Sequence, residues 1–246
     1  MDVRILPTAA AMSAAAADAA AASLARTIAA AGTARLVLAT AASQIGFQRE
    51  LTERPELDWT RIEIFQLDEY VGLPADHPAR FSRLLTDHVL RPAGAQWTHL
   101  LSGRTAADII DRTSRAISAK PIDLAVLGIG ENAHLAFNDP PADFETDAEY
   151  AIVTLDETCR RQQVGEGWFE RLEDVPVTAI SMTIRQILKA REILVVVPDA
   201  RKAAAVQAAL EGDLTPDVPA SILRRHPHVT IFLDEPAAAQ LRTRRT

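Results

Sequence analysis

Five short apolar runs constrain the fold of this chain more than any other feature of its sequence. They lie at residues 34–39, 62–67, 122–127, 192–197 and 229–233. A run that is continuously apolar predicts a strand covered on both faces, as in a parallel sheet between two layers of helices. The runs therefore predict an α/β fold with a doubly wound, mostly parallel sheet.

Helices are predicted between these runs, at residues 13–31, 78–90, 105–119, 184–190 and 201–211. Gly212 is well placed to end the last of them. The chain has 246 residues, of which 48% are hydrophobic, and it contains no Gly/Ser-rich linker and no internal repeat. We therefore expect residues 1–246 to form a single domain.

The net charge and the single cysteine limit the partners and the compartment that we expect. A formal charge of −7 at pH 7 argues against a nucleic-acid binder, because phosphate backbones attract basic surfaces. Cys159 has no partner for an intrachain disulfide, which favours the reducing cytoplasm. Asp18 and Arg26 interrupt the Ala-rich residues 9–31, so we expect a helix packed on the sheet rather than a signal peptide or a membrane segment. The number of subunits stays open, and a homo-oligomer is compatible with the sequence.

Ligands of open α/β sheets bind beyond the carboxyl ends of the strands, so the residues after each apolar run are candidate site residues. Asp68 and Glu69 follow the second run, where a carboxylate with few solvating neighbours can act as a general base. Position alone favours an ordinary solvated or helix-capping carboxylate, because Asp234 and Glu235 follow the last run in the same way.

The segment after the third run is the richest in polar groups. Gly128 and Gly130 allow a ligand to approach the backbone, and Asn132, His134 and Asp139 follow close behind. A histidine beside a carboxylate or an amide can exchange protons near neutral pH. The alternative is a structural histidine that is hydrogen-bonded in a turn.

Lys202 follows the fourth run, at the start of a predicted helix, where its ammonium and the helix N–H groups can hold a phosphate. A solvated surface lysine is the more frequent situation at such a position. The sequence has no convincing metal-ligand spacing, no Walker motif and no G-x-S-x-G elbow. We therefore expect neither a metal nor a nucleotide.

Several segments, in the same order along the chain, resemble the signature segments of glucosamine-6-phosphate deaminases. They are residues 65–74, 128–140, 202–212, 221–227 and 234–236. On these motifs the chain is identified as a divergent member of the glucosamine-6-phosphate deaminase and 6-phosphogluconolactonase superfamily, in its deaminase branch. The resemblance implies a Rossmann-like three-layer αβα sandwich with a mostly parallel central sheet, and no cofactor.

The resemblance also implies an activity and roles for three residues. The expected enzyme is an aldose-ketose isomerising deaminase, which converts glucosamine 6-phosphate, or a close amino sugar phosphate, and water to fructose 6-phosphate and ammonia. Asp68 would move a proton between C2 and C1, His134 would assist ring opening, and Lys202 would bind the phosphate. The alternatives are a 6-phosphogluconolactonase-like hydrolase and a sugar-phosphate-binding protein without turnover.

The histidine segment departs from the family pattern at three positions. Asn132 replaces the usual aspartate, Ala133 the usual glycine, and Asp139 the usual glutamate. Asn132 and Asp139 remain expected catalytic residues, although an amide can orient a histidine but cannot stabilise an imidazolium by charge. If Asn132 only weakens ring opening, the substitution Asn132→Asp should raise turnover.

The expected phosphate-binding loop departs as well. Where the family has Gly-Gly-Thr or Gly-Ser-Thr after a threonine, the residues here are Thr40, Ala41, Ala42 and Ser43. Methyl groups limit backbone approach and left-handed torsions, whereas the serine can still donate a hydrogen bond. The arginine that joins the lysine in the family has no clear counterpart, and Arg160 or Arg161 is the candidate substitute.

Overall fold

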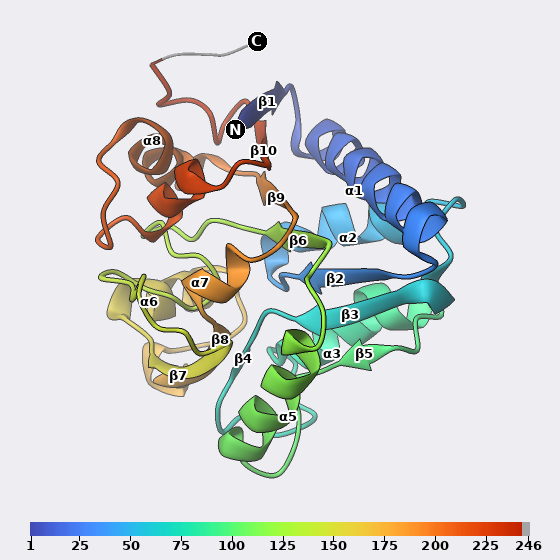
Figure 1. The fold of residues 1–246 in the computed structure, drawn as a ribbon. Coiled ribbons are helices and arrows are strands. Elements are labelled where there is room, and N and C mark those ends of the chain that lie inside the picture. Colours follow the sequence, from blue (N-terminus) through green and yellow to red (C-terminus); the bar gives the residue numbers. More distant parts are fainter. Residues whose placement is uncertain (243–246) are drawn as a thin grey trace.

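Seven parallel strands form the central sheet of the computed structural model, which describes residues 1–242 (Figure 1). Their order across the sheet is β1-β10-β9-β6-β2-β3-β5. Their bounds are β1 Asp2–Leu6, β2 Ala34–Leu38, β3 Ile62–Gln66, β5 Thr98–His99, β6 Leu124–Leu127, β9 Glu192–Val197 and β10 Val229–Asp234. The predicted α/β fold with a parallel central sheet is confirmed, and the last four residues of the predicted domain lie outside the described part.

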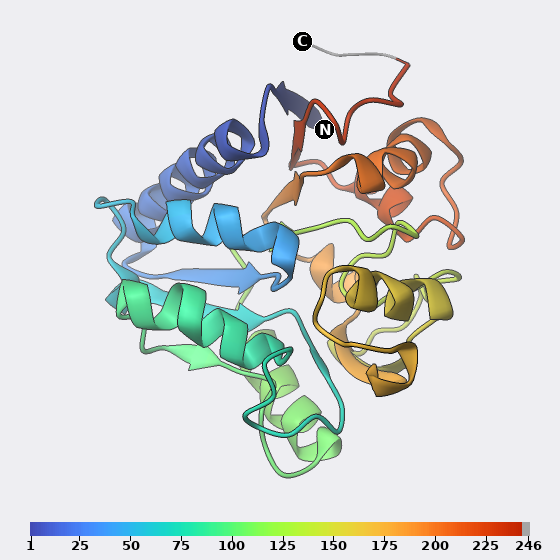
Figure 2. The ribbon, with the colours of Figure 1, turned by 180° about the vertical axis from the view of Figure 1, so that it is seen from behind.

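Helices cover both faces of this sheet (Figure 2). Their bounds are α1 Ala9–Ala31, α2 Ile45–Thr52, α3 Phe81–Leu85, α4 Arg91–Ala93, α5 Ala106–Ser118, α6 Glu157–Gly165, α7 Ile184–Ile187 and α8 Ala203–Glu211. Successive strand residues alternate between two apolar cores, as the two-residue period of a strand requires. In β9, Leu194 and Val196 pack in the core that contains α1 and α2, whereas Ile193 and Val195 pack in the core that contains α5, α7 and α8.

The Ala-rich segment forms α1, a helix of 23 residues that packs on the sheet as predicted. Thr8 caps its first turn by accepting the N–H of Ala11, and Gly32 ends it in the left-handed conformation with a φ of 82°. Its buried face includes Met12 and Leu24. No helix in the described part of the chain is long and apolar enough to cross a membrane.

A second, antiparallel sheet of three strands lies beside the central one, and the sequence did not predict it. Its strands, in spatial order, are β4 Asp68–Tyr70, β8 Thr178–Met182 and β7 Tyr150–Thr154. Leu67 alone separates β3 from β4, so the chain passes directly from the large sheet into the small one. Tyr70, Phe81 and Phe137 belong to a third apolar cluster, which packs the small sheet against its surroundings.

The order of strands in the central sheet reverses between β2 and β6. From β2 the chain continues outward through β3 to β5, whereas from β6 it continues in the other direction through β9 to β10. Neighbouring strands whose connections run to opposite sides leave a crevice at their carboxyl ends. This topology places the candidate site at the ends of β2 and β6.

Candidate active site

A pocket opens where the segments after β2, β3, β6 and β9 converge. Its described lining consists of Ala39, Thr40, Ala41, Ser43, Gln44, Leu67, Asp68, Phe81, Gly128, Ile129, Gly130, His134, Ala136, Phe137, Gln162, Gln163 and Lys202. The structure therefore brings Asp68, His134 and Lys202 together, as the sequence predicted. Ala42 lies in an adjoining hollow, which shares Ser43 and Lys202 with this pocket.

Asp68 is the first residue of β4, rather than a loop residue as its place after an apolar run suggested. Its backbone is fixed by antiparallel pairing with Ser181 of β8. The side chain is buried, and its Oδ1 has no hydrogen-bond partner among the described residues. Burial, together with the charge of Glu69, raises the pKa of Asp68 well above its ordinary value. A buried carboxyl without a partner, at the wall of a pocket, is suited to exchange a proton with a ligand.

Glu69 has a structural task instead. Its Oε1 accepts the backbone N–H of Phe81 at 3.1 Å, and its Oε2 accepts that of Ser82 at 2.8 Å, at the start of α3. The helix-capping alternative is therefore confirmed for Glu69. Asp234, the last residue of β10, also accepts backbone N–H groups, from Asp199 and Ala237.

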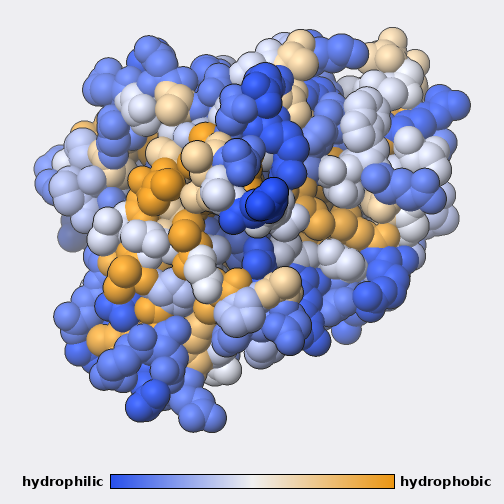
Figure 3. All heavy atoms as spheres, turned by 90° about the horizontal axis from the view of Figure 1, so that it is seen from below, coloured by the Kyte–Doolittle hydropathy of each residue, from blue (hydrophilic) through white to orange (hydrophobic). Residues whose placement is uncertain are grey.

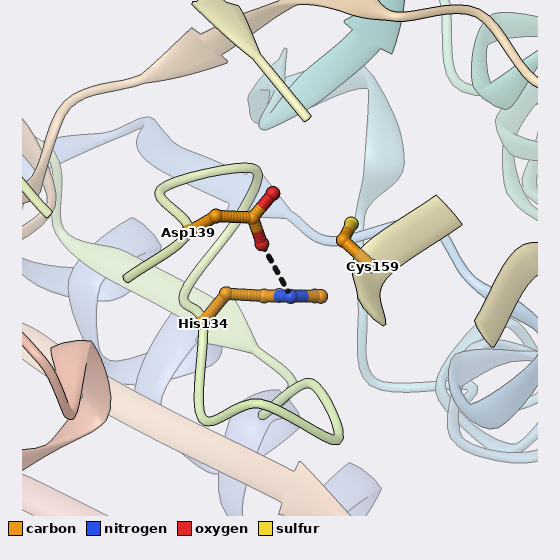
Figure 4. Close-up of side chains that lie close together, drawn as sticks. All are labelled: His134, Asp139 and Cys159. Atoms are coloured by element: carbon orange, nitrogen blue, oxygen red, sulfur yellow. Dashed lines mark ion pairs between the residues drawn. The ribbon is translucent and has the colours of Figure 1, made fainter. Parts of the chain in front are cut away.

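His134 lines the pocket with a carboxylate on its other side. Its Nδ1 lies 3.0 Å from Oδ1 of Asp139 (Figure 4). Burial pushes the pKa of Asp139 upward, but the hydrogen bond and charge of His134 outweigh it, with help from Asn132 and the backbone N–H of Asp156, and leave the pKa lowered. Asp139 thus stays ionised and orients the ring, which leaves Nε2 as the nitrogen available to a ligand.

Among the described residues, no hydrogen bond joins Asn132 to the imidazole ring, so its amide can orient the histidine only through Asp139 and the backbone N–H of His134. Its Nδ2 donates to Asp139 Oδ1 at 3.0 Å and to Asp156 Oδ2 at 2.9 Å. Its Oδ1 accepts the backbone N–H of His134 at 3.2 Å. The negative charge beside the ring therefore comes from Asp139, and Asn132 contacts that carboxylate.

The turn that carries His134 is tightly constrained. A Cβ at Gly130 would lie between 2.2 and 2.4 Å from three atoms of the His134 ring, so only glycine leaves room for the ring there. Ala133 and Ala136 have φ values of 67° and 53°, in the left-handed region that favours glycine. Alanine at position 133 thus adopts a strained conformation that glycine would adopt without strain.

The loop after β2 accommodates its alanines without such strain, because none of its residues needs the left-handed torsions that a methyl group disfavours. Ala41 is extended, with a φ of −158° and a ψ of 166°, and Ala42 begins a short 3₁₀ helix, Ala42–Gln44. Neither Ala42 nor Ser43 has a positive φ. The Oγ1 of Thr40 is buried and has no hydrogen-bond partner among the described residues, so it is available to a ligand.

Lys202 ends a 3₁₀ turn that leads into α8, and it is only 3% exposed. A solvated surface lysine is therefore excluded. Burial lowers the pKa of Lys202, although the carboxylates of Glu166 and Glu131 oppose the shift. An anion bound in the pocket would restore the charge balance around this buried ammonium.

Arg160 does not line the pocket. Its Nη2 donates to the carbonyl oxygen of Leu172 at 2.6 Å and to that of Val175 at 3.1 Å, which ties α6 to the chain that follows it. Arg161 pairs with Glu157 on the exposed face of α6. The structure therefore places neither arginine beside Lys202, because each guanidinium is already bound elsewhere.

Two glutamines of α6 line the pocket instead, and the sequence analysis did not identify them as site residues. Gln162 accepts the backbone N–H of Glu131 at 3.0 Å, and Gln163 accepts the hydroxyl of Tyr70 at 2.7 Å. Both are fixed by these bonds, which connect α6 to the histidine segment and to β4. No local motif marks them in the sequence, since their role depends on how α6 packs.

The described residues that are best placed to hold a metal ion are His134, Asp139 and Cys159, whose ligand atoms lie within 4.8 Å of one another (Figure 4). The 3.0 Å between the histidine and the carboxylate is a hydrogen-bond distance. Burial raises the pKa of the Cys159 thiol, and nearby carboxylates raise it further. The thiol is therefore neutral, whereas a metal binds the thiolate, and the pairing of His134 with Asp139 accounts for the approach of these two side chains.

A model of the family of glucosamine-6-phosphate isomerases and 6-phosphogluconolactonases matches residues 7–232. The chain belongs to this family. The match covers every site residue named above, from Thr40 to Lys202, and it confirms the resemblance on which their roles were predicted.

Relatives within the family are named as deaminases. A glucosamine-6-phosphate deaminase of Exiguobacterium sibiricum is 38% identical over 206 residues, which are 83% of this chain and 80% of that protein. One from Lactobacillus delbrueckii subsp. bulgaricus is 33% identical over 86% of this chain and 89% of its own length. A solved structure described as a monomeric glucosamine-6-phosphate deaminase has a TM-score of 0.87 and 30% identity, and the alignment covers 97% of this chain and 99% of that one.

The other branch of the family shares the fold. A solved 6-phosphogluconolactonase from Shewanella baltica has a TM-score of 0.78 over 95% of this chain and 97% of its own. At 21% identity this similarity supports a shared architecture only. The site residues, rather than the fold, must therefore separate the two activities within the family.

Proposed function

We propose that this family member is a glucosamine-6-phosphate deaminase, which converts glucosamine 6-phosphate and water to fructose 6-phosphate and ammonia. The observation that carries the proposal is that one pocket is lined both by Asp68, whose buried Oδ1 has no hydrogen-bond partner among the described residues, and by His134, whose ring pairs with Asp139 behind it. An isomerisation that also opens a sugar ring needs two separate groups for proton transfer. The relatives named as deaminases support the same assignment.

In this proposal Asp68 takes the proton from C2 of the substrate and returns it to C1. Burial and the charge of Glu69 raise the pKa of Asp68 and so favour its protonated form. The amino group of the substrate is an ammonium, and its positive charge next to Asp68 would favour the ionised form that acts as a base. Binding of the substrate would thereby ionise the carboxyl that removes its C2 proton.

His134 exchanges a proton with the ring oxygen and the C1 hydroxyl, and so opens the sugar ring. Asp139 on Nδ1 stabilises the positive charge that develops on the imidazole during this exchange. Asp139 and Asn132, both expected as catalytic residues, act in this proposal through the histidine rather than on the substrate.

Lys202 binds the phosphate, together with the loop of Thr40, Ala41, Ala42 and Ser43. The buried ammonium supplies the charge, while the Oγ1 of Thr40 and the hydroxyl of Ser43 supply hydrogen bonds. Arg160 has no part in this proposal, since its guanidinium is bound to backbone carbonyls.

We further propose that the protein acts as a monomer in the cytoplasm. The solved relative that is 30% identical is described as monomeric, and Cys159 is a free, buried thiol. Seen from below, apolar side chains reach the surface in several places among hydrophilic ones (Figure 3). Size-exclusion chromatography with light scattering checks the state, because a homo-oligomer would elute with a multiple of 26.7 kDa.

The test is ammonium release with matched detection of fructose 6-phosphate from purified protein and glucosamine 6-phosphate. Equal amounts of both products are expected, with galactosamine 6-phosphate and unphosphorylated glucosamine as comparison substrates. Hydrolysis of 6-phosphogluconolactone in place of ammonium release would support the lactonase instead. Tight binding of the sugar phosphate without any product would support a binding protein.

A further inference from the structure

The amide of Asn132 lies between two carboxylates. Its Nδ2 carries two protons and donates two hydrogen bonds, to Asp139 Oδ1 at 3.0 Å and to Asp156 Oδ2 at 2.9 Å. Its Oδ1 accepts the backbone N–H of His134, so both the nitrogen and the oxygen of this amide are hydrogen-bonded. The amide is therefore fixed in orientation by three bonds to three different residues.

Asp156 completes the arrangement from the other side. It is the N-cap of α6, where its Oδ1 accepts the N–H of Cys159 at 2.5 Å. Its backbone N–H donates to Asp139 Oδ2 at 2.9 Å. The start of α6 thus holds one oxygen of Asp139, while Asn132 and His134 hold the other.

We propose that Asn132 and Asp156 form a matched amide–carboxylate pair that positions Asp139, and through it His134, for proton transfer. The proposal rests on the proposed function, since it assigns a task within that reaction. Asn132 supplies the donor that lets two carboxylates lie side by side, and Asp156 anchors that donor to α6. Neither touches the substrate, so both are positioning residues.

This assignment reverses what the sequence suggested for position 132. An aspartate at position 132 would place an oxygen, which cannot donate when ionised, where the amide nitrogen now donates to Asp139 and Asp156. Three carboxylates in contact cannot all remain ionised, so one must take up a proton or the cluster must open. The substitution Asn132→Asp is therefore expected to lower turnover, although it restores the residue that is usual in the family.

The matched pair also predicts a rescue. In the double variant Asn132→Asp/Asp156→Asn, the amide and the carboxylate exchange places. The amide at 156 can still cap Cys159 through its oxygen while its nitrogen donates to the carboxylate at 132. The number of carboxylates in the cluster then returns to two, and Asp139 keeps its bond to His134.

The experiment compares wild type, Asn132→Asp, Asp156→Asn and the double variant by the pH dependence of kcat/KM for ammonium release. Loss of an outer hydrogen-bond partner of a functional histidine typically costs about 10- to 100-fold, and we expect Asn132→Asp to fall in this range. We also expect the acidic limb of its profile to move to higher pH, because the crowded cluster binds an extra proton. The titratable groups that face Asp139 in this titration are His134, Asp156 and the thiol of Cys159.

The double variant is expected to turn over substrate faster than Asn132→Asp. If positions 132 and 156 acted independently, the fold-losses in kcat/KM of the two single variants would instead multiply in the double variant. Wild-type or higher turnover in Asn132→Asp, or a double variant slower than both single variants, would overturn the proposal.

A second measurement separates this proposal from the proposed function. NMR titration of the His134 imidazole, assigned with His134→Gln, reports the cluster whether or not the protein turns over the amino sugar. The titration midpoint is expected to shift in Asn132→Asp and to return toward the wild-type value in the double variant. An unshifted midpoint in Asn132→Asp would contradict the positioning role, and absent turnover with the expected shifts would contradict only the assigned reaction.

Discussion

Asp68 and Asp139 are two carboxylates of one site in opposite surroundings. Oδ1 of Asp68 meets no donor among the described residues, whereas Asp139 lies 3.0 Å from His134 Nδ1 and accepts hydrogen bonds from Asn132 and the backbone N–H of Asp156. Burial disfavours the charge of both, but only Asp139 has donors that outweigh it. The pKa of Asp68 is therefore raised and that of Asp139 lowered, so the placement of donors, more than burial, decides which of the two carboxyls favours its charged form.

The contrast between Asp68 and Asp139 predicts that substitution of Asp68 has the largest effect on activity. Asp68→Asn should lower kcat by about 100- to 10,000-fold, the range for loss of a general base, with KM changed only a few-fold. The same variant should unfold at a higher temperature at pH 7, because a carboxyl with a raised folded-state pKa destabilises the fold wherever it would be ionised in the unfolded chain. This gain should vanish below the ordinary pKa of 3.8, where the carboxyl is protonated in both states. Ammonium release and thermal unfolding across pH 3 to 8 measure both effects.

Glu69→Gln is the matched control for that variant. Glu69 accepts backbone N–H groups at the start of α3, so the amide should lower stability by about 1 to 2 kcal/mol, the usual range for a lost cap. If Asp68→Asn and Glu69→Gln both destabilised the protein, the distinction between the two neighbours would not hold.

The next largest effect concerns the buried cation at the other end of the pocket. Lys202→Met should raise KM for glucosamine 6-phosphate by about 10- to 100-fold, the equivalent of one hydrogen bond to a charged group. Unphosphorylated glucosamine should be used equally by both proteins, because it has no phosphate to lose. Equal KM values for the phosphorylated substrate in the two proteins would show that the anion binds elsewhere.

A comparable loss of activity is expected at Asp139, together with a change in stability opposite in sign to that at Asp68. Asp139→Asn should lower kcat/KM by about 10- to 100-fold, at least as much as Asn132→Asp, because it removes the charge that pairs with His134 directly. It should also destabilise the fold by about 1 to 2 kcal/mol at pH 7. A carboxyl with a lowered folded-state pKa stabilises the protein above its ordinary pKa of 3.8 and loses that contribution as the pH falls through the folded-state value. The difference from wild type in urea unfolding should therefore disappear in acid.

The smallest effect tests the strain beside His134. Ala133→Gly should stabilise the protein by about 0.5 to 1 kcal/mol, the left-handed strain of about 1 to 2 kcal/mol minus the added flexibility of glycine in the unfolded chain. Turnover should stay unchanged, since the backbone path is the same. Ala136→Gly repeats the test at the second alanine with a positive φ, and loss of stability in both variants would contradict the account of strain.

The large sheet was predictable because its central strands are buried on both faces. The apolar runs at 34–39, 62–67, 122–127, 192–197 and 229–233 became β2, β3, β6, β9 and β10. The edge strand Asp2–Leu6 and the two-residue strand Thr98–His99 carry no such run. The helix Ile45–Thr52 was missed because it begins directly after the loop that was expected to bind phosphate.

The small sheet could not be predicted in the same way. β7 reads Tyr150–Thr154 with only its first residue fully buried, so its pattern is that of an exposed segment. Its pairing with β8 joins residues far apart in the chain, and no local signal encodes that contact.

At the site, His134 and Asp139 are close in sequence and could be paired in advance. Asp156, Gln162 and Gln163 could not, because the packing of α6 brings Asp156 to Asp139 and the two glutamines to the pocket. Arg160 was misjudged for the same reason, since its carbonyl partners belong to the segment that follows the helix.

The direct passage from β3 into β4 has an implication for how this scaffold can be altered. Asp68 belongs to the small sheet, whereas His134 is carried by a segment that leaves the large one. The distance between Asp68 and His134 is therefore an adjustable dimension of the scaffold, because Tyr70, Phe81 and Phe137 pack together between the segments that carry these two residues, and two of the three line the pocket. A library that varies the volumes of these three aromatic residues would search for new sugar substrates without replacing a single group that handles protons.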